Sequence, residues 1–260
     1  MTNESKTLFI PLYGKAIMSK EGFINDKTAE KIIESEKESF DNVDQSRKLA
    51  IYMAMRAEQY DEIVRNFIKE NSDSVIIQLG CGLDSRINRV NLKPLMWYDL
   101  DFPDVIELRK KYYSESDFYT MIPSSVTKYS WLDKITCNSD NVLIMAEGLS
   151  MYLSETDMKN LIEKFRNKFK KSTFIFDAYS HFASKMSKYK NPINNVDAKI
   201  DFAMDDPAIL ENRNVNCVLN SDIIKQEYVN KLRGIDKIRF KFMGGAGKNM
   251  YRIFGYEITQ

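Results

Sequence analysis

The residues best suited to chemistry in this 260-residue chain are two glycines and the acids that follow them. Gly80 and Gly82 come directly after an apolar run, 74–79, which predicts a buried strand. Glycine lets the backbone turn tightly there and lets a ligand approach without a Cβ in the way. Asp99 and Asp101 stand 17 and 19 residues after Gly82, the distance at which an acid holds ribose hydroxyls. The spacing predicts a site for a ligand that contains adenosine.

The next position in this motif bears on which adenosine ligand would bind. A dinucleotide fingerprint has a third glycine three residues after the second, and Ser85 occupies that place. NAD needs the third glycine because its pyrophosphate sits on a helix N-terminus that packs closely against the strand. S-adenosylmethionine has no phosphate and needs only the turn and the ribose acid. The residues favour S-adenosylmethionine, while NAD and a plain strand-to-helix turn stay open as alternatives.

A third acid of interest is Glu147, which follows the apolar run 141–145 and precedes Gly148. In an open α/β sheet, ligands bind outside the carboxyl ends of the strands. A carboxylate at such a place is costly to bury unless it is paired. Glu147 is therefore either a ligand-side acid or a solvent-facing residue of a helix-capping loop.

The scarce residue types exclude several kinds of function. His181 is the one histidine, and Cys81, Cys137 and Cys217 form no C-x-x-C pair, so we expect no metal site and no disulfide framework. Thirty-eight basic residues against 37 acidic ones predict no general attraction to nucleic acid or to an anionic membrane. The chain has no apolar leader and no run of 18 apolar residues, so we expect a cytoplasmic protein without a membrane span.

The elements that must position these residues differ on the two sides of residue 70. The first part is helical in pattern, with Asp26 and Asp44 as candidate N-caps. Steps of four and three between apolar residues predict a helix within 47–70, at Met53, Ala57, Tyr60, Val64 and Phe67. Beyond residue 70, short apolar runs alternate with helical stretches, which predicts a parallel sheet with right-handed crossovers.

The expected elements after residue 70 are five strands, two helices and a terminal hairpin. The strands are 74–79, 95–100, 118–122, 141–145 and 173–176. The helices are 103–113 and 154–170, the second with Ser154 and Asp157 as a capping box. A glycine-rich turn between 238–243 and 250–258 predicts the hairpin. We expect one structural unit, made of a helical extension over 1–70 and a main domain over 71–260, with an insertion at about 180–235.

Several stretches, in order along the chain, resemble the leucine carboxyl methyltransferase family of S-adenosylmethionine-dependent O-methyltransferases. They are LFIPLYGKA (8–16), MAMRAEQYDEIVRNFI (53–68), QLGCGLDSR (78–86), WYDLDFPDVIELRKKY (97–112), AEGLSMYLSE (146–155) and FAMDDPAIL (202–210). The chain is most similar to the bacterial branch that resembles the tetracenomycin polyketide O-methyltransferase. The resemblance implies a Rossmann-like class I methyltransferase fold with a seven-stranded, mostly parallel sheet whose last strand is antiparallel.

The resemblance also implies roles for particular residues, with S-adenosylmethionine as cofactor and S-adenosylhomocysteine as product. Gly80 and Gly82 match the cofactor turn of the family. Asp101 matches the acid that holds the ribose, and Asp99 is the alternative for that role. Glu147 matches the acid that lies against the cofactor.

Further cofactor contacts follow from the same resemblance. Arg56 matches an arginine that binds the methionine carboxylate, and Lys15 is a second basic residue for that role. The family has an Asp-Leu pair about six residues before a tryptophan, where the acid reaches the adenine amino group. Counting back from Trp131, this chain has Ser125 and Val126 instead, so the adenine contact is made without a charge.

The implied reaction is an in-line displacement at the methyl group of a sulfonium. A carboxylate acceptor is already ionised near neutral pH and needs no general base. Alignment of the reactants can supply about 7–11 kcal/mol of the barrier. A hydroxyl acceptor more often needs a base, for which Tyr13, Tyr179 and His181 are the candidates, none assigned as catalytic.

The predicted function is methylation of a carboxylate or hydroxyl of a small molecule, polyketide-like or another metabolite. One variant is a protein C-terminal carboxyl methyltransferase. The alternatives are an NAD-dependent oxidoreductase on a similar fold and a non-catalytic binding protein that keeps the fold. The departure at Ser125 is the sequence feature that supports the last of these.

Overall fold

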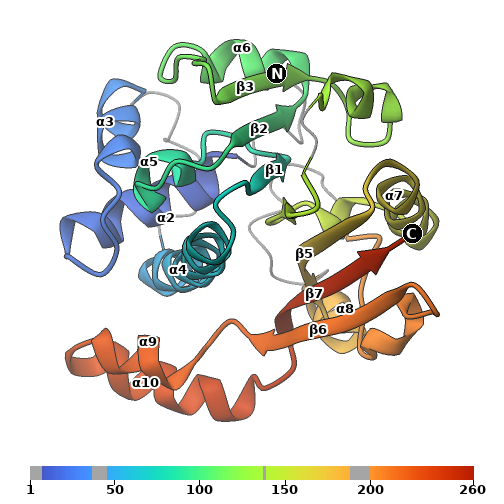
Figure 1. The fold of residues 1–260 in the computed structure, drawn as a ribbon. Helices are drawn as coiled ribbons and strands as arrows, with labels where there is room; N and C mark the ends of the chain where they lie inside the picture. Colours follow the sequence, from blue (N-terminus) through green and yellow to red (C-terminus); the bar gives the residue numbers. More distant parts are fainter. Residues whose placement is uncertain (1–7, 37–45, 137–138, 188–199) are drawn as a thin grey trace.

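The computed structural model describes residues 8–36, 46–136, 139–187 and 200–260. Seven strands form one sheet in the order β3-β2-β1-β4-β5-β7-β6 (Figure 1). They are β1 (Val75–Leu79), β2 (Met96–Asp101), β3 (Tyr119–Pro123), β4 (Val142–Ala146), β5 (Lys171–Tyr179), β6 (Val215–Asp222) and β7 (Tyr251–Thr259). Strands β1 to β5 are parallel, and β7 is antiparallel to both of its neighbours. The predicted sheet is confirmed.

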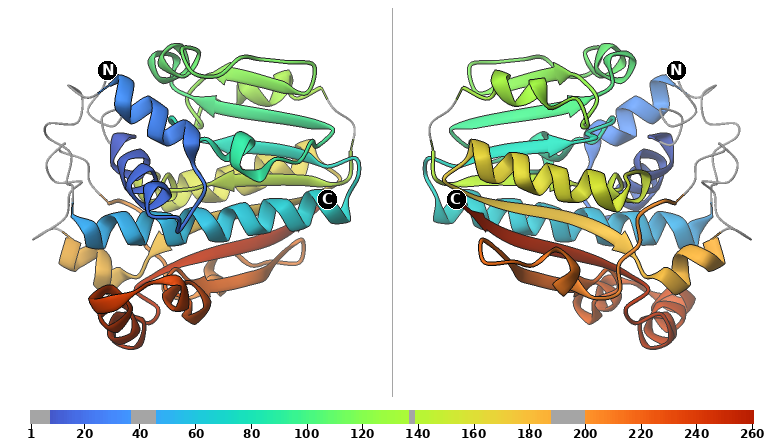
Figure 2. Two further views of the ribbon diagram at one scale, coloured as in Figure 1. Left: turned by 90° about the vertical axis from the view of Figure 1, so that its left-hand side faces the viewer. Right: turned by 90° about the vertical axis from the view of Figure 1, so that its right-hand side faces the viewer.

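Helices cover both faces of this sheet. Figure 2 shows α2, α3 and α4 in front of one face and α7 in front of the other. The helices are α2 (Phe9–Lys20), α3 (Lys27–Ser35), α4 (Arg47–Glu70), α5 (Arg86–Val90), α6 (Pro103–Arg109), α7 (Glu155–Lys168), α8 (His181–Ser187), α9 (Gln226–Lys231) and α10 (Gly234–Ala246). Short 3₁₀ turns are η2 (Tyr129–Lys134), η3 (Ser150–Tyr152) and η5 (Pro207–Leu210). Within the described ranges, no helix is long and apolar enough to cross a bilayer.

The central strands are apolar on both sides because both of their faces are covered. Every residue of β1 and of β4 is buried. Successive residues of β1 alternate between two cores, with Ile76 on the side of α2 to α4 and Ile77 on the side of α7. This double burial is what continuous apolar runs in a parallel sheet predict.

Two of the predicted helix starts are confirmed by capping contacts. The Asp26 side chain accepts a hydrogen bond from a backbone N–H of α3. Ser154 and Asp157 form the expected capping box of α7. Helix α4 begins after Ser46, whose side chain caps it. Asp44, the other candidate, lies outside the described residues.

The C-terminal part of the fold corrects the predicted hairpin. Residues 234–246 form helix α10, and β7 pairs instead with β6, which lies inside the range expected to be an insertion. Apolar residues in a short run do not by themselves distinguish helix from strand. We predicted a turn from Gly244, Gly245 and Gly247, but these glycines lie at the C-terminal end of the helix, whose C-cap is Gly247. The division into 1–70 and 71–260 stays a prediction.

The close crossing of α2 and α4 depends on Gly14. A Cβ built on Gly14 would lie 3.0 Å from the Ala50 Cα and 3.2 Å from the Met53 Cβ. These neighbours belong to α4, and one of the two atoms is backbone, so they have little room to move. Glycine therefore sets how closely the two helices approach each other.

We predict that Gly14→Val lowers the free energy of unfolding by about 1–3 kcal/mol, because the added methyl groups force α2 away from α4. Gly245→Ala is the matched control, since a Cβ there meets nothing within 4 Å. That change should instead stabilise the protein by about 0.5–1 kcal/mol, because alanine favours a helix more than glycine does. Chemical denaturation measures both variants, and equal effects would contradict this role of Gly14.

Candidate functional site

A cavity of about 350 Å³ lies at the carboxyl ends of β1, β2 and β4. All eight residues predicted to bind the cofactor line it: Lys15, Arg56, Gly80, Gly82, Asp101, Ser125, Val126 and Glu147. The volume falls within the range of small-molecule sites, which is about 300–1,000 Å³. The structure thus brings the predicted residues together, while their contacts with a cofactor stay a prediction.

The glycine turn and Asp101 form one hydrogen-bonded unit. Gly80 and Gly82 have φ of +63° and +49°, a region that L side chains rarely adopt. The N–H of Gly82 donates to Asp101 Oδ2 at 2.7 Å, and the N–H of Phe102 donates to Asp101 Oδ1 at 2.8 Å. Burial raises the pKa of Asp101 to about 6, although these two donors oppose the rise. The turn therefore holds the carboxylate in place beside the cavity.

Asp99 has a different role from Asp101. Its carboxylate is fully buried and accepts hydrogen bonds from Arg109 Nη2 at 2.5 Å and from the Tyr119 hydroxyl at 2.6 Å. The same arginine donates to the backbone carbonyl of Gly82 at 3.0 Å. Asp99 thus anchors the cofactor turn from behind, and it lies outside the cavity lining. Of the two acids, Asp101 is the one that lines the cavity.

A network of buried ion pairs joins the N-terminal helices to the turn after β1. Lys15 of α2 forms an ion pair with Asp84. Arg89 of α5 lies 2.8 Å from Asp84, 2.7 Å from Asp61 of α4 and 2.8 Å from Asp26 before α3. Burial alone would raise the pKa of Asp84, but the surrounding cations hold it well below its usual range. Three separate helices are thereby fixed against one acidic turn.

Glu147 belongs to the same network and does not face solvent. It accepts a hydrogen bond from Arg56 Nε at 2.9 Å and forms an ion pair with Arg86. Its side chain is 7% exposed. Burial acts to raise the pKa of Glu147, but the two guanidinium groups outweigh it and leave the pKa lowered. The reading of Glu147 as a solvent-facing capping residue is therefore wrong.

Behind Arg56 lies a second buried carboxylate, Asp177, near the end of β5. It faces Arg56 Nη1 at 3.4 Å, and it accepts hydrogen bonds from the Tyr60 hydroxyl and the Gly148 N–H, both at 2.8 Å. The Tyr251 hydroxyl also donates to it. Burial raises the pKa of Asp177, against the opposing effect of Arg56. This carboxylate fixes both the arginine and the loop that carries Glu147.

The sequence analysis missed five residues of this network: Asp61, Asp84, Arg86, Arg89 and Asp177. Asp84 and Arg86 stand in the quoted motif after β1, where only the glycines received a role. Asp177 follows an apolar run at the carboxyl end of a strand, which is the signal that singled out Glu147. Ser85, at the place of the absent third glycine, donates to Asp26 at 2.5 Å and accepts from Arg89 at 2.8 Å.

The loop after β3 presents Ser125 and Val126 to the cavity, and their contact with adenine stays a prediction. The Ser125 hydroxyl lies 3.0 Å from the Thr127 hydroxyl, and the Val126 carbonyl accepts from Trp131 Nε1 at 3.0 Å. The buried tryptophan thus holds the loop backbone from inside. A hydroxyl here can accept a hydrogen bond from an amino group, but it adds no charge.

Of the three candidate bases, only Tyr179 lines the cavity. Its ring stacks on Tyr251 at 4.1 Å, and burial raises its pKa to about 12, so it stays protonated near neutral pH. His181 is exposed, with Nδ1 2.7 Å from Asp205, and both it and Tyr13 lie outside the cavity lining. In the described part of the chain, no three His, Cys, Asp or Glu side chains are grouped to hold a metal ion.

Comparison with known proteins identifies the family. The model of the leucine carboxyl methyltransferase family matches residues 3–166. Over 216 residues the chain is 32% identical to the tetracenomycin polyketide synthesis O-methyltransferase TcmP of Streptomyces glaucescens, covering 82% of this chain and 80% of TcmP. The chain belongs to the leucine carboxyl methyltransferase family. The protein is an S-adenosylmethionine-dependent O-methyltransferase, as the resemblance implied, and the choice between S-adenosylmethionine and NAD is decided.

One further relative and one solved structure are similar to this methyltransferase. The S-adenosyl-L-methionine-dependent methyltransferase dpfgK of Gibberella zeae is 26% identical over 235 residues, covering 81% of this chain and 78% of dpfgK. The plantazolicin methyltransferase BpumL, solved with an analogue and S-adenosylhomocysteine, superposes with a TM-score of 0.55 over 100% of both chains. At 10% identity, BpumL shows the shared class I methyltransferase fold alone.

We predict that Asp177→Asn weakens S-adenosylhomocysteine binding by about tenfold or more, because Arg56 loses the charge that holds it in place. Removing one partner of a buried ion pair should also lower the free energy of unfolding, by about 3–5 kcal/mol. Calorimetric titration and chemical denaturation measure the two effects. In the matched control, Asp140→Asn, the exposed pair with Lys170 is broken, and at most about 1 kcal/mol should be lost.

Proposed function

We propose that this methyltransferase binds S-adenosylmethionine in the cavity at the strand ends and transfers its methyl group to an oxygen of a small, largely apolar acceptor. The proposal rests on one observation: the glycine turn (Gly80 and Gly82), Asp101 and the paired cations Lys15 and Arg56 all line the same cavity. When bound, the cofactor supplies an electrophilic methyl group on a sulfonium. The residues around it bind and align the two reactants.

The residues at the turn fit the adenosine end of the cofactor. A carboxylate offers about four lone-pair positions, and backbone N–H groups take two of those on Asp101. Two remain for the two ribose hydroxyls. A Cβ built on Gly82 would lie 3.4 Å from the Leu8 Cβ, so a side chain here would narrow the cavity beside the ribose acid.

The network of ion pairs fits the methionine end. That end is a zwitterion, with one ammonium and one carboxylate group. The cavity lining offers both signs side by side, with Lys15 and Arg56 for the carboxylate and Glu147 and Asp84 for the ammonium. Because these side chains already hold one another in place, little further ordering is needed when the ligand binds.

The remaining lining supports an acceptor with an apolar body. It consists mainly of aliphatic and aromatic side chains, at Leu8, Ile10, Pro11, Leu49, Met53, Met151, Tyr152 and Tyr179. A protonated Tyr179 offers no base near neutral pH, which favours an acceptor oxygen that is already ionised, such as a carboxylate. We further propose a cytoplasmic location, no nucleic-acid partner, and a helical cap over 1–70 that forms one structural unit with 71–260.

We predict that S-adenosylmethionine and S-adenosylhomocysteine stabilise the protein against heat, whereas NAD does not. A ligand at roughly 100 times its dissociation constant adds about 2.7 kcal/mol of stability. A thermal melting series with the three compounds measures this. A shift with NAD alone would contradict the proposed cofactor.

The same preparation then tests transfer with a labelled methyl donor and paired acceptors. Apolar carboxylic acids and the alcohols of the same carbon skeleton form the pairs. Transfer to the acids in preference to the alcohols supports the proposed acceptor. Cofactor binding without transfer to any acid, alcohol or phenol in the screen would instead support the non-catalytic alternative.

We predict that affinity for S-adenosylhomocysteine falls as the pH is lowered from about 8 to about 5, because Asp101 has a pKa of about 6 and binds ribose hydroxyls as the carboxylate. Below that pKa the loss approaches about tenfold per pH unit. Calorimetric titration across this range gives the profile. Glu107→Gln, an exposed change on the neighbouring helix α6, should keep this pH profile, whereas Asp101→Asn should bind weakly at every pH.

Ionisation of Asp101 favours ligand binding but lowers the folding stability of the ligand-free protein. Its folded pKa lies above the ordinary value of 3.8, so the ionised form costs stability that the protonated form does not. Asp101→Asn keeps one of the two acceptor oxygens, so its absolute stability also reflects a lost backbone hydrogen bond. Its stability relative to wild type, both without ligand, should rise as the pH goes up from about 4 to about 6. A difference in stability that does not change with pH would contradict the raised pKa of Asp101.

A further inference from the structure

Helix α10 presents an apolar stripe to solvent. Ile235, Ile238 and Phe242 are 66%, 55% and 76% exposed. Their spacing of three and four residues places them on one side of the helix. The inner side is anchored separately, by fully buried Phe240 and by Asp236, which accepts a hydrogen bond from Arg47 at 2.6 Å. The exposed residues are therefore not needed to pack α10 on the protein.

Five basic residues lie on α10 or next to its ends, and two of them, Arg239 and Lys241, flank the stripe. Arg233, Lys237, Arg239, Lys241 and Lys248 are all exposed. Asp236 is the one acid between residues 233 and 248, and its side chain is buried. On a helical projection, Arg239 and Lys241 lie on opposite sides of the three apolar residues. We expected no membrane contact because the net charge of the chain is near zero. A net charge does not show that basic residues are concentrated in one cluster.

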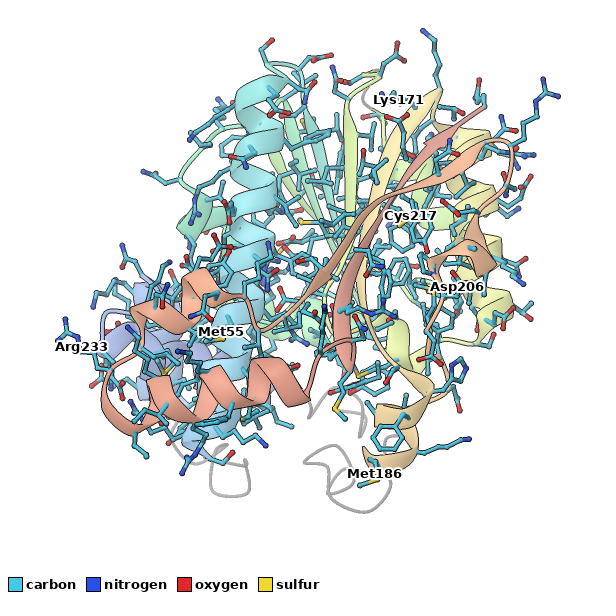
Figure 3. All side chains as sticks on the ribbon, turned by 90° about the horizontal axis from the view of Figure 1, so that it is seen from below. Met55, Lys171, Met186, Asp206, Cys217 and Arg233 are labelled. Carbon is cyan, nitrogen blue, oxygen red and sulfur yellow. The ribbon has the colours of Figure 1, made fainter. Side chains whose placement is uncertain are left out.

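The position of α10 leaves the stripe accessible. Figure 1 places α9 and α10 at the lower edge of the molecule, and in Figure 3, seen from below, α10 lies in the foreground with Arg233 pointing outward. The sequence analysis did not find this surface because it read 238–243 as a strand. As a helix, the same residues separate into a buried side and an exposed side.

We propose that the α10 face (Ile235, Ile238 and Phe242 with the flanking basic residues) docks on an anionic lipid surface. A helix with an apolar stripe between basic side chains lies in the plane of a bilayer interface, with its apolar residues among the acyl chains and its cations at the phosphates. The cytoplasmic leaflet supplies the negative potential that such a cluster needs. The helix lies on the membrane and does not span it.

Charge argues against a second copy of the chain as the occupant. A two-fold symmetric contact places the same patch on both sides of the interface. Five cations would then face five cations with no exposed acid from this segment between them, which is unfavourable. An acidic protein would match the charge, but three side chains on a convex helix offer no groove. A bilayer requires no complementary shape.

Vesicle flotation tests the proposal with the whole chain. We expect binding to phosphatidylcholine vesicles that contain phosphatidylserine and none to phosphatidylcholine alone, with weaker binding as salt is added. Arg239→Glu with Lys241→Glu should reduce binding by more than about tenfold, since each basic residue near the surface contributes about 1 kcal/mol. Ile238→Ser with Phe242→Ser should reduce it by a similar factor, because the apolar anchors are removed.

Phe182→Ser is the matched control, since Phe182 is an exposed phenylalanine on α8, and it should bind like wild type. The thermal shift with S-adenosylhomocysteine should be unchanged in all variants, which shows that they are folded and separates this test from that of the proposed function. No binding to anionic vesicles at low salt would overturn the proposal, as would binding that the α10 variants leave unchanged. A dimer in solution that Phe242→Ser dissociates would assign the face to a second copy instead.

Discussion

The structure depends on burying charge at one edge of its sheet. Asp84, Glu147 and Asp177 follow or end three different strands, and each is paired with a cation from outside that strand. Desolvation makes an unpaired carboxylate in such a place very costly, so the acids require partners at fixed positions. Arginine provides most of them because its guanidinium bonds several acceptors at once. The network is therefore a constraint on the fold as well as part of the cavity lining.

This constraint explains why the N-terminal helices are part of the site. Lys15 lies on α2 and Arg56 on α4, so the cations that complete the network come from the segment before the first strand. Gly14, one residue before Lys15, sets the approach of the same two helices. Packing of α2 and α4 and pairing of charge at the strand ends are consequently coupled. In the proposed cofactor complex, the two cations for the methionine carboxylate come from helices, and the acid for the ribose comes from the sheet.

The strand-end site could be predicted from the sequence because its signals are local. Apolar runs that end in Gly80, Asp101 and Glu147 mark the carboxyl edge of a parallel sheet, and the family resemblance added Lys15 and Arg56. The ion pairs could not be predicted, since Asp61 and Arg86, or Asp177 and Arg56, meet only through the tertiary fold. The prediction of a terminal hairpin was wrong because the apolar spacing over 235–243 fits a helix and a strand about equally well. The pairing of β7 with β6 leaves 234–246 to form a helix.

The most direct measurement is a crystal structure of the protein with S-adenosylhomocysteine. The account predicts the ribose hydroxyls within hydrogen-bonding distance of Asp101, the methionine carboxylate beside Lys15 or Arg56, and the pairing of Glu147 with Arg56 retained. A ligand that binds in this cavity with its ribose away from Asp101, or that breaks the ion pairs to enter, would contradict the claim that the buried network is a preformed cofactor site.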